Sequence, residues 1–237
     1  MVRSERGQGA AVLCSSGLDS AVLLADVARR AAVAENHEIG ATNQKVVPIY
    51  VSVGLAWEQE ELAMLDRLLA TAPFRDVQPV QALRFDMRDI YPFSHWAIRG
   101  EPPGFDTPDE DVYLEGRNIV LLTKAAIFAA RASLSTIFIG PLAGNPFPDA
   151  TPEFFETMSR ALSIGLAADI DIAAPLARMH KAEVIALGRS LGVPLELTLS
   201  CMQPRSGVHC GRCSKCRERK NAFIEAGGTD PTDYSGG

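Results

Sequence analysis

The sequence predicts an α/β protein in which a doubly wound parallel sheet carries helices on both faces and precedes a small C-terminal metal-binding module. Three observations lead to this fold class. Short apolar runs alternate with segments of helical spacing along most of the chain. The first apolar run ends in a turn of small residues at the start of a helix, and four cysteines lie close together near the C-terminus. We therefore divide the chain into an α/β domain, residues 1–194, and a C-terminal module, residues 195–237, packed on it.

Bulk composition fits a globular protein and limits the possible partners. The 237 residues suffice for one α/β domain with a modest appendage, and contents of 47% hydrophobic and 22% charged residues are ordinary. A net charge of −6 argues against a general nucleic-acid binder. No segment approaches the roughly 20 apolar residues that span a bilayer, and the N-terminus is too polar for a signal peptide. We expect a cytoplasmic protein with no membrane association and no stable nucleic-acid partner.

The first element predicts a phosphate-binding corner. Residues 10–13 have the length of a buried parallel strand, residues 15–17 form a tight turn, and a helix begins near Asp19 and continues to Arg30. Backbone N–H groups at a helix start lack intrahelical partners and favour an anion. Ser15 and Ser20 add hydroxyl groups, and Gly17 lets the backbone approach a ligand closely. The predicted nucleotide-binding residues are Cys14, Ser15, Ser16, Gly17, Leu18, Asp19, Ser20, Ala21, Val22, Leu23 and Leu24.

Two well-known phosphate motifs are excluded at this corner. No lysine follows the loop, so the Walker pattern GxxxxGK(S/T) is absent. Gly7 and Gly9 form a GxG pair, but they precede the strand, whereas a dinucleotide fingerprint follows it. An ordinary strand-turn-helix corner without a ligand stays an alternative at this point.

The remaining elements follow in order. Apolar runs predict strands at residues 45–51, 77–83, 136–140 and 169–173. Helical spacing predicts helices at residues 57–72, 116–132, 152–167 and 181–191, with a polar stretch at 35–43. The glutamates Glu58, Glu60 and Glu61 suit a helix N-terminus, and Thr151 before Pro152 suits a cap. Residues 84–113 form a long proline-rich, acidic loop that suits a substrate lid, a subunit contact or a plain surface loop.

The cysteine cluster predicts a metal site. Cys201, Cys210, Cys213 and Cys216 have the spacing C-x8-C-x2-C-x2-C, and four thiolates around one ion suit zinc, with metal–sulfur distances of about 2.3 Å. A shell of four protein ligands leaves no open position, which indicates a structural rather than a catalytic role. Disulfides are the alternative in a secreted protein, but nothing in the sequence indicates secretion. The remaining cysteine, Cys14, fits a packed thiol.

Basic residues surround the cysteines: Arg212, Lys215, Arg217, Arg219 and Lys220. Part of this run compensates the negative charge of the thiolates. A surface that binds nucleic acid is the more specific alternative.

Taken together, these motifs resemble a known family. The run from Ser15 to Ser20 resembles the PP-loop of ATP pyrophosphatases, usually SGGxDS, with Ser16 in place of the first glycine. With the cysteine pattern, the chain resembles the 7-cyano-7-deazaguanine synthase family of PP-loop enzymes over most of its length. Further matching motifs are Gly116-Arg117-Asn118, Pro148-Asp149 before Pro152-Glu153-Phe154, Pro175-Leu176, Lys181-Ala182-Glu183 and the tail from Asp230 to Tyr234.

The resemblance implies an adenine nucleotide alpha hydrolase-like fold and a carbon–nitrogen ligase of queuosine biosynthesis. It implies conversion of 7-carboxy-7-deazaguanine and ammonia to the nitrile through an adenylated intermediate, with ATP, Mg²⁺ and a structural zinc ion. It also implies a homodimer. Carried onto this sequence, it assigns catalysis to Asp19, Arg117 and Lys181 and substrate binding to Phe147, Asp149 and Asn118. Without it, Arg117 fits a surface ion pair, Lys181 a solvated helix position and Phe147 the core.

Departures from the family pattern keep other functions open. The family usually has Tyr-Gly-Gln-Arg-His after the second strand, where this chain has Val53 to Trp57. Glu115 stands in place of a proline and Ala150 in place of a cysteine. The alternatives are a related PP-loop enzyme that acts on another carboxylate or stops at the amide, a PP-loop tRNA-modifying enzyme, and a non-catalytic nucleotide-binding zinc module.

Overall fold

A parallel sheet organises the molecule. The computed structural model describes residues 9–37 and 45–235. Within them, five strands pair in the order β3-β2-β1-β4-β5, and each pairing is parallel. The strands are β1 (Gly9–Leu13), β2 (Lys45–Ser52), β3 (Gln81–Arg84), β4 (Thr136–Phe138) and β5 (Asp171–Ala173). Because the chain adds strands first on one side of β1 and then on the other, the loops after β1 and β4 diverge and leave a crevice at the carboxyl edge.

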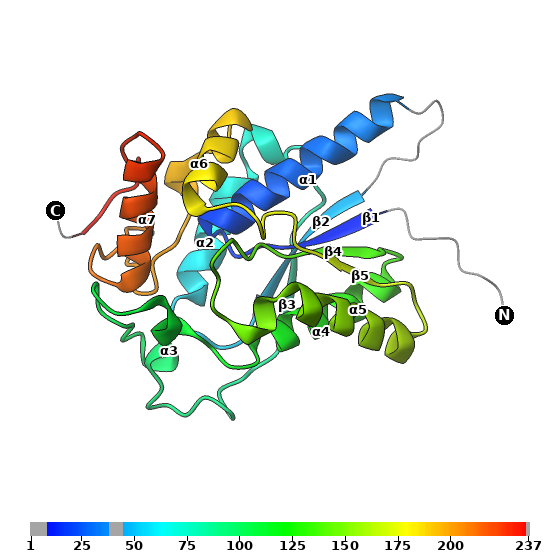
Figure 1. Cartoon of the computed structure of the whole chain (residues 1–237), viewed down its shortest axis with the longest axis horizontal. Helices are drawn as coiled ribbons and strands as arrows, with labels where there is room; N and C mark the ends of the chain where they lie inside the picture. The colour runs from blue at the N-terminus through cyan, green and yellow to red at the C-terminus, as the bar shows by residue number, and fades with distance from the viewer. Residues whose placement is uncertain (1–8, 38–44, 236–237) are drawn as a thin grey trace.

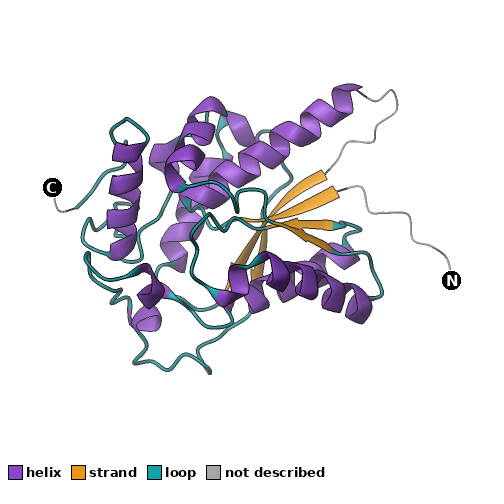
Figure 2. Cartoon of the chain, in the orientation of Figure 1, coloured by secondary structure: helices purple, strands orange, loops and turns teal. Residues whose placement is uncertain are grey.

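Helices cover both faces of this sheet, as Figure 1 and Figure 2 show. They are α1 (Leu18–His37), α2 (Glu58–Leu69), α3 (Trp96–Arg99), α4 (Arg117–Arg131), α5 (Pro152–Leu166), α6 (Lys181–Ser190) and α7 (Ser214–Glu225). Helices α1 and α6 pack on one face, and α4 and α5 pack on the other. The predicted doubly wound α/β class is confirmed. Across the described ranges, no helix has both the length and the apolar character needed to cross a bilayer.

Strand residues alternate between two apolar cores. In β1, Ala11 and Leu13 belong to the core shared with α4 and α5, while Val12 packs with α1 and α6. All three side chains are buried. A strand buried on both faces accounts for the continuous apolar run in the sequence.

Prolines shift two of the predicted boundaries. The strand expected at 77–83 forms only from Gln81, because Pro79 has no N–H for the ladder. The helix expected at 57–72 ends at Leu69, and Ala72 and Pro73 begin a short 3-10 turn instead. The cap at Thr151 forms as expected, since its Oγ1 accepts from the Phe154 N–H at 3.2 Å.

Other differences lie at the ends of elements and in the C-terminal module. Helix α1 continues beyond Arg30 to His37, and residues 38–43 of the expected polar stretch lie outside the described residues, as does Gly7. The sequence pattern does not predict helix α7, because the helix is polar on most sides and its first residues belong to the cysteine motif. It carries Cys216 and follows Cys213 directly.

Candidate active site

One cleft opens at the carboxyl edge of the sheet. Its two lobes share Ser15, Gly17 and Asp19 from the PP-loop and Arg117 and Phe147 from the other side. The loop after β1 and the loop after β4 both contribute residues to its lining, at the edge where the strand order predicts a ligand site. Residues that the sequence assigns to nucleotide and to substrate therefore face the same cavity.

The PP-loop is held by its own hydrogen bonds. Ser20 Oγ accepts from the Ser15 N–H at 3.2 Å and donates to the Gly17 carbonyl at 2.9 Å. These two hydrogen bonds join the two sides of the loop through the Ser20 hydroxyl. Ser16 has a φ of 60°, the left-handed region that favours glycine. This backbone conformation explains why glycine is usual there in the resembling family.

Not all residues predicted to bind nucleotide line the cleft. Ser15, Gly17, Leu18, Asp19, Ser20 and Cys14 do. Ser16, Ala21, Val22, Leu23 and Leu24 are buried and lie outside the lining, where they support the start of α1. Burial also raises the pKa of the Cys14 thiol, so this cysteine is not an activated nucleophile.

Asp19 meets Lys181 across the mouth of the loop. Lys181 Nζ donates to Asp19 Oδ2 at 2.7 Å and to a second carboxylate, Glu218 Oε1, at 2.9 Å. Burial by itself lowers the pKa of Lys181, but the two carboxylates outweigh burial and raise it, so the ammonium stays charged. Asp19 Oδ1 is buried with no partner in the described part of the chain. An unpaired carboxylate oxygen beside a phosphate loop fits a magnesium ion that arrives with a nucleotide.

The opposite wall suits a flat heterocycle. Asn118 donates its backbone N–H and its side-chain amide to the two carboxylate oxygens of Asp149, at 3.1 and 3.2 Å. Burial raises the pKa of Asp149, although these hydrogen bonds lower it. Tyr113 and Phe147 stack beside it with ring centroids 5.0 Å apart. Arg117 Nε is buried and has no partner among the described residues, so it is available to an anion.

The second lobe of the cleft is the one that Lys181, Lys215 and Glu218 line. It contains a carboxylate that the sequence analysis did not assign to the site. Glu61 lines it together with Trp57 and Trp96, whose rings stack at 5.9 Å. Tyr50 Oη donates to Glu61 Oε2 at 2.9 Å. Burial raises the pKa of Glu61 to about 7, although Arg117 and the Tyr50 hydrogen bond lower it. The available signal was the three-residue spacing of Glu58 and Glu61 on the buried face of α2.

The four cysteines meet as predicted. Their sulfur atoms all lie within 4.8 Å of one another, and all four residues are buried. The Sγ atoms of Cys213 and Cys216 are 3.5 Å apart, and those of Cys210 and Cys216 are 3.9 Å apart. Tetrahedral zinc with sulfur at about 2.3 Å requires sulfur–sulfur distances of about 3.8 Å. Cys201 Sγ also accepts two backbone N–H groups, from Gln203 and Cys210, which suits a thiolate. The donor set therefore fits a thiolate-bound metal ion.

The long loop at 84–113 contacts the C-terminal module, residues 195–237, which is called the cysteine module from here on. Gln203 Nε2 donates to the Gly100 carbonyl at 2.8 Å, and the Ser214 N–H donates to the Pro103 carbonyl at 3.3 Å. Arg217 pairs with Asp109 at 3.3 Å. Since Trp96 and Asp109 of this loop also line the cleft, the loop forms a wall between the sheet edge and the module.

Comparisons with known proteins identify relatives over most of the chain. The model of the family described as Queuosine biosynthesis protein QueC matches residues 103–227. A 7-cyano-7-deazaguanine synthase of Methanothrix thermoacetophila is 34% identical over 95% of this chain and 98% of its own. The enzyme of that name from Koribacter versatilis is 35% identical over 98% of this chain and 95% of its own.

A solved structure shares the fold. The U34-tRNA thiolase NcsA of Methanococcus maripaludis aligns with a TM-score of 0.50 at 11% identity, covering 93% of this chain and 68% of that chain. Such low identity supports the common PP-loop fold only. The family match and the full-length relatives decide the family, and the chain belongs to the QueC family of 7-cyano-7-deazaguanine synthases.

Proposed function

We propose that this chain is an ATP-dependent carbon–nitrogen ligase that converts 7-carboxy-7-deazaguanine and ammonia to 7-cyano-7-deazaguanine in queuosine biosynthesis. One observation supports this function most: the PP-loop and the Asn118–Asp149 pair face the same cleft. The loop suits the phosphates of ATP, and the buried Asp149 suits the N–H groups of a purine-like ring. Relatives over nearly the whole chain carry this enzyme name.

The chemistry follows from the weakness of a carboxylate as an electrophile. Its oxygen attacks the α-phosphorus of ATP, which forms an acyl-adenylate and releases pyrophosphate. Ammonia then forms the C–N bond and releases AMP. The amide oxygen then attacks the α-phosphorus of a second ATP and releases a second pyrophosphate. Loss of AMP and of the nitrogen protons from the adenylated amide leaves the nitrile.

The chain's own groups match these needs. PP-loop amides hold the pyrophosphate, and Arg117 offers an unpaired N–H to charge that builds on the oxygens. Phe147 stacks on the heterocycle while Asp149 accepts from it. Asp19 and Lys181 organise the phosphate end of the site. Zinc in the four-cysteine site supplies structural cross-linking and no open coordination position. Homodimer formation, a cytoplasmic location and the absence of a stable nucleic-acid partner stay predictions.

A second candidate is a paralogue that acts on a related carboxylate or stops at the amide. The structure gives this alternative a specific basis, because Trp57, one of the departures from the family pattern, forms a wall of the second lobe next to Glu61. A changed wall changes which acid fits.

The test is pyrophosphate release from ATP and Mg²⁺, with and without ammonia and with a panel of purine-like acids. We expect release only with 7-carboxy-7-deazaguanine and a product with the mass of the nitrile. An amide product, or faster release with another acid, favours the paralogue. No release with any acid favours a non-catalytic nucleotide-binding module, and an iron–sulfur chromophore in the purified protein favours a tRNA-modifying enzyme.

A further inference from the structure

Four charged side chains alternate along one wall of the second lobe. Lys181 Nζ lies 2.7 Å from Asp19 Oδ2 and 2.9 Å from Glu218 Oε1, and Lys215 Nζ lies 2.7 Å from Glu218 Oε2. All four residues line the cleft. The row begins in the PP-loop and ends on α7, one residue before the metal-ligand candidate Cys216. The cysteine module therefore places charged groups in the cleft.

The charges in this row indicate which cation is available for phosphate. Lys181 is shared between two carboxylates, so its single positive charge is already matched before any ligand binds. Among the described residues of the lining, the basic side chains are Arg117, Lys181 and Lys215. Lys215 has one carboxylate partner, and its side chain is 27% exposed. It can turn to an incoming anion without leaving two acids unpaired.

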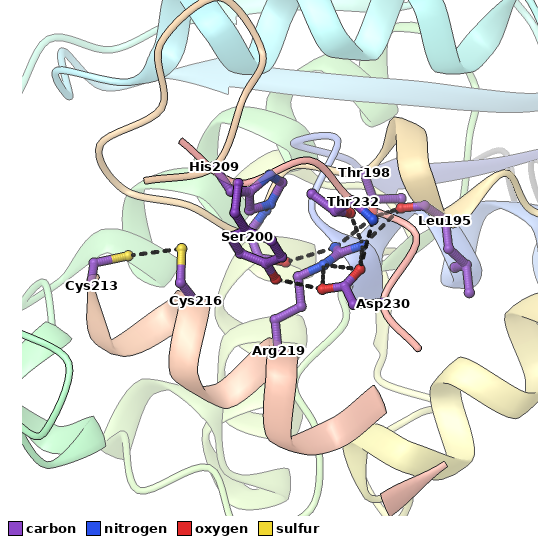
Figure 3. A network of polar contacts seen from close by, with 10 residues as sticks. Leu195, Thr198, Ser200, His209, Cys213, Cys216, Arg219, Asp230 and Thr232 are labelled. Carbon is purple, nitrogen blue, oxygen red and sulfur yellow. Dashed lines mark hydrogen bonds and ion pairs between the residues drawn. The ribbon is translucent and has the colours of Figure 1, made fainter. Parts of the chain in front are cut away.

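The position of α7 is fixed from several sides. Figure 3 shows Arg219, a fully buried residue of α7, reaching Thr198, Ser200 and Asp230. Arg219 Nη1 donates to Thr198 Oγ1 at 2.8 Å and to Ser200 Oγ at 3.3 Å. Figure 3 also shows Cys213 and Cys216 at the beginning of the same helix.

This anchored segment touches the PP-loop itself. Between Thr198 and Ser200, the Leu199 N–H donates to the Ser16 carbonyl at 2.9 Å. The cysteine module thus meets the loop at two places, by a backbone hydrogen bond and through the row of charges. The backbone of Lys215 is consequently held at a set position relative to the phosphate loop, as a binding residue requires.

We infer that Lys215 binds the phosphate groups of the nucleotide. The cysteine module then supplies part of the active site in addition to its structural role. The ligand class is the triphosphate of ATP and the pyrophosphate that leaves it. Glu218 holds Lys215 and Lys181 beside each other until the anion arrives. The inference rests on the proposed nucleotide-binding function of the PP-loop.

Calorimetric titration of the full-length protein with Mg²⁺–ATP and with Mg²⁺–pyrophosphate tests it. Lys215→Met should weaken binding of each by roughly fivefold to tenfold, because one cation is lost from a partly buried anion site. Lys215→Arg, which keeps the charge, should recover most of the affinity. The matched control is Lys45→Met, which removes the same charge from an exposed position at the far, amino end of β2. Its affinity should stay within about twofold of the wild type.

Metal content and the thermal midpoint, measured on each variant, should be unchanged, which separates binding from folding. Equal affinities for Lys215→Met and the wild type would overturn the role of Lys215 while nucleotide binding itself stands. A similar loss of affinity in Lys45→Met would assign the effect to net charge and would also overturn the role of Lys215. Wild-type protein that binds neither ligand would remove the proposed function together with this inference.

Discussion

The Lys181 ammonium lies 2.7 Å from Asp19 Oδ2, and this ion pair joins two residues that are 162 positions apart in the sequence. It places the start of α6 against the start of α1, at the phosphate end of the cleft. Asp19 uses one carboxylate oxygen for this pair and keeps the other unpartnered within the described residues. Asp19 is therefore the acid whose removal should affect phosphate chemistry most directly.

Asp19→Ala should lower substrate-dependent pyrophosphate release by about 100-fold or more, because charge stabilisation around the leaving group is lost. The circular dichroism spectrum and the metal content should match those of the wild type. Asp66→Ala, at an exposed position of α2, is the control and should leave turnover unchanged. Unchanged turnover in Asp19→Ala would show that this carboxylate is not part of the reaction.

Ser16→Gly should raise the free energy of unfolding by about 1 kcal/mol. The substitution relieves a left-handed backbone and removes a buried hydroxyl that has no partner in the described chain. Ser133 has a similar φ of 57° but lies between α4 and β4, away from the cleft. Ser133→Gly is therefore the control for the backbone effect alone. A less stable Ser16→Gly protein in urea unfolding would show that the loop depends on the serine.

Glu61→Gln should change stability in a pH-dependent way. The pKa of Glu61 is raised from 4.5 to about 7 in the folded protein. Below about pH 4 Glu61 is protonated in both the folded and the unfolded chain, so its ionisation does not lower the stability of the fold. As the pH rises to 7, the unfolded chain loses the proton first, and the wild type loses stability, by about 3 kcal/mol in full.

Glutamine at position 61 cannot ionise and keeps an oxygen that can accept from Tyr50. The variant should therefore gain about 2 kcal/mol over the wild type between pH 5 and pH 8, measured by urea unfolding at both values. A difference that stays constant over this range would contradict a raised pKa at Glu61.

Asn118→Ala should raise the KM for the deazaguanine acid by about tenfold, because Asp149 loses the side-chain hydrogen bond that orients it. The KM for ATP should change by less than about twofold, since the phosphate end of the cleft is untouched. Thr123→Ala, five residues further along α4, provides the control, because the Thr123 hydroxyl donates to the Ile119 carbonyl of the helix backbone. An equal rise of both KM values would mean that Asn118 supports the fold of the cleft rather than Asp149.

Cys213→Ser should lower the metal content to well below one ion per chain and reduce the free energy of unfolding by roughly 3 kcal/mol or more. Cys14→Ser also removes a buried thiol but lies outside the cluster, so its metal content should be that of the wild type. Elemental analysis and thermal unfolding of both variants give the answer. A metal-replete, fully stable Cys213→Ser protein would rule out a structural metal site at this cysteine.

Local patterns in the sequence predicted the fold class and the two main motifs of this structure. Apolar runs of strand length and helical spacing predict the α/β class, because burial on a parallel sheet imposes those periods directly on the chain. The PP-loop and the cysteine spacing are short motifs whose residues lie near one another along the chain. They were therefore readable before any fold was known, and the four sulfur atoms do meet.

The shared cleft depends on contacts between distant segments. Only the packed structure pairs Asp19 with Lys181, brings Lys215 of α7 to the same wall, and turns Glu61 from a surface-like acid at a helix start into a buried group with a raised pKa. Sequence spacing cannot predict these relations, because they are set by strand order and by the solvent that packing excludes. The sequence by itself predicted the strands and helices of the sheet and the two motifs, but not α7. Tertiary packing decided which charges face one another and how strongly they interact, because burial and strand order set both.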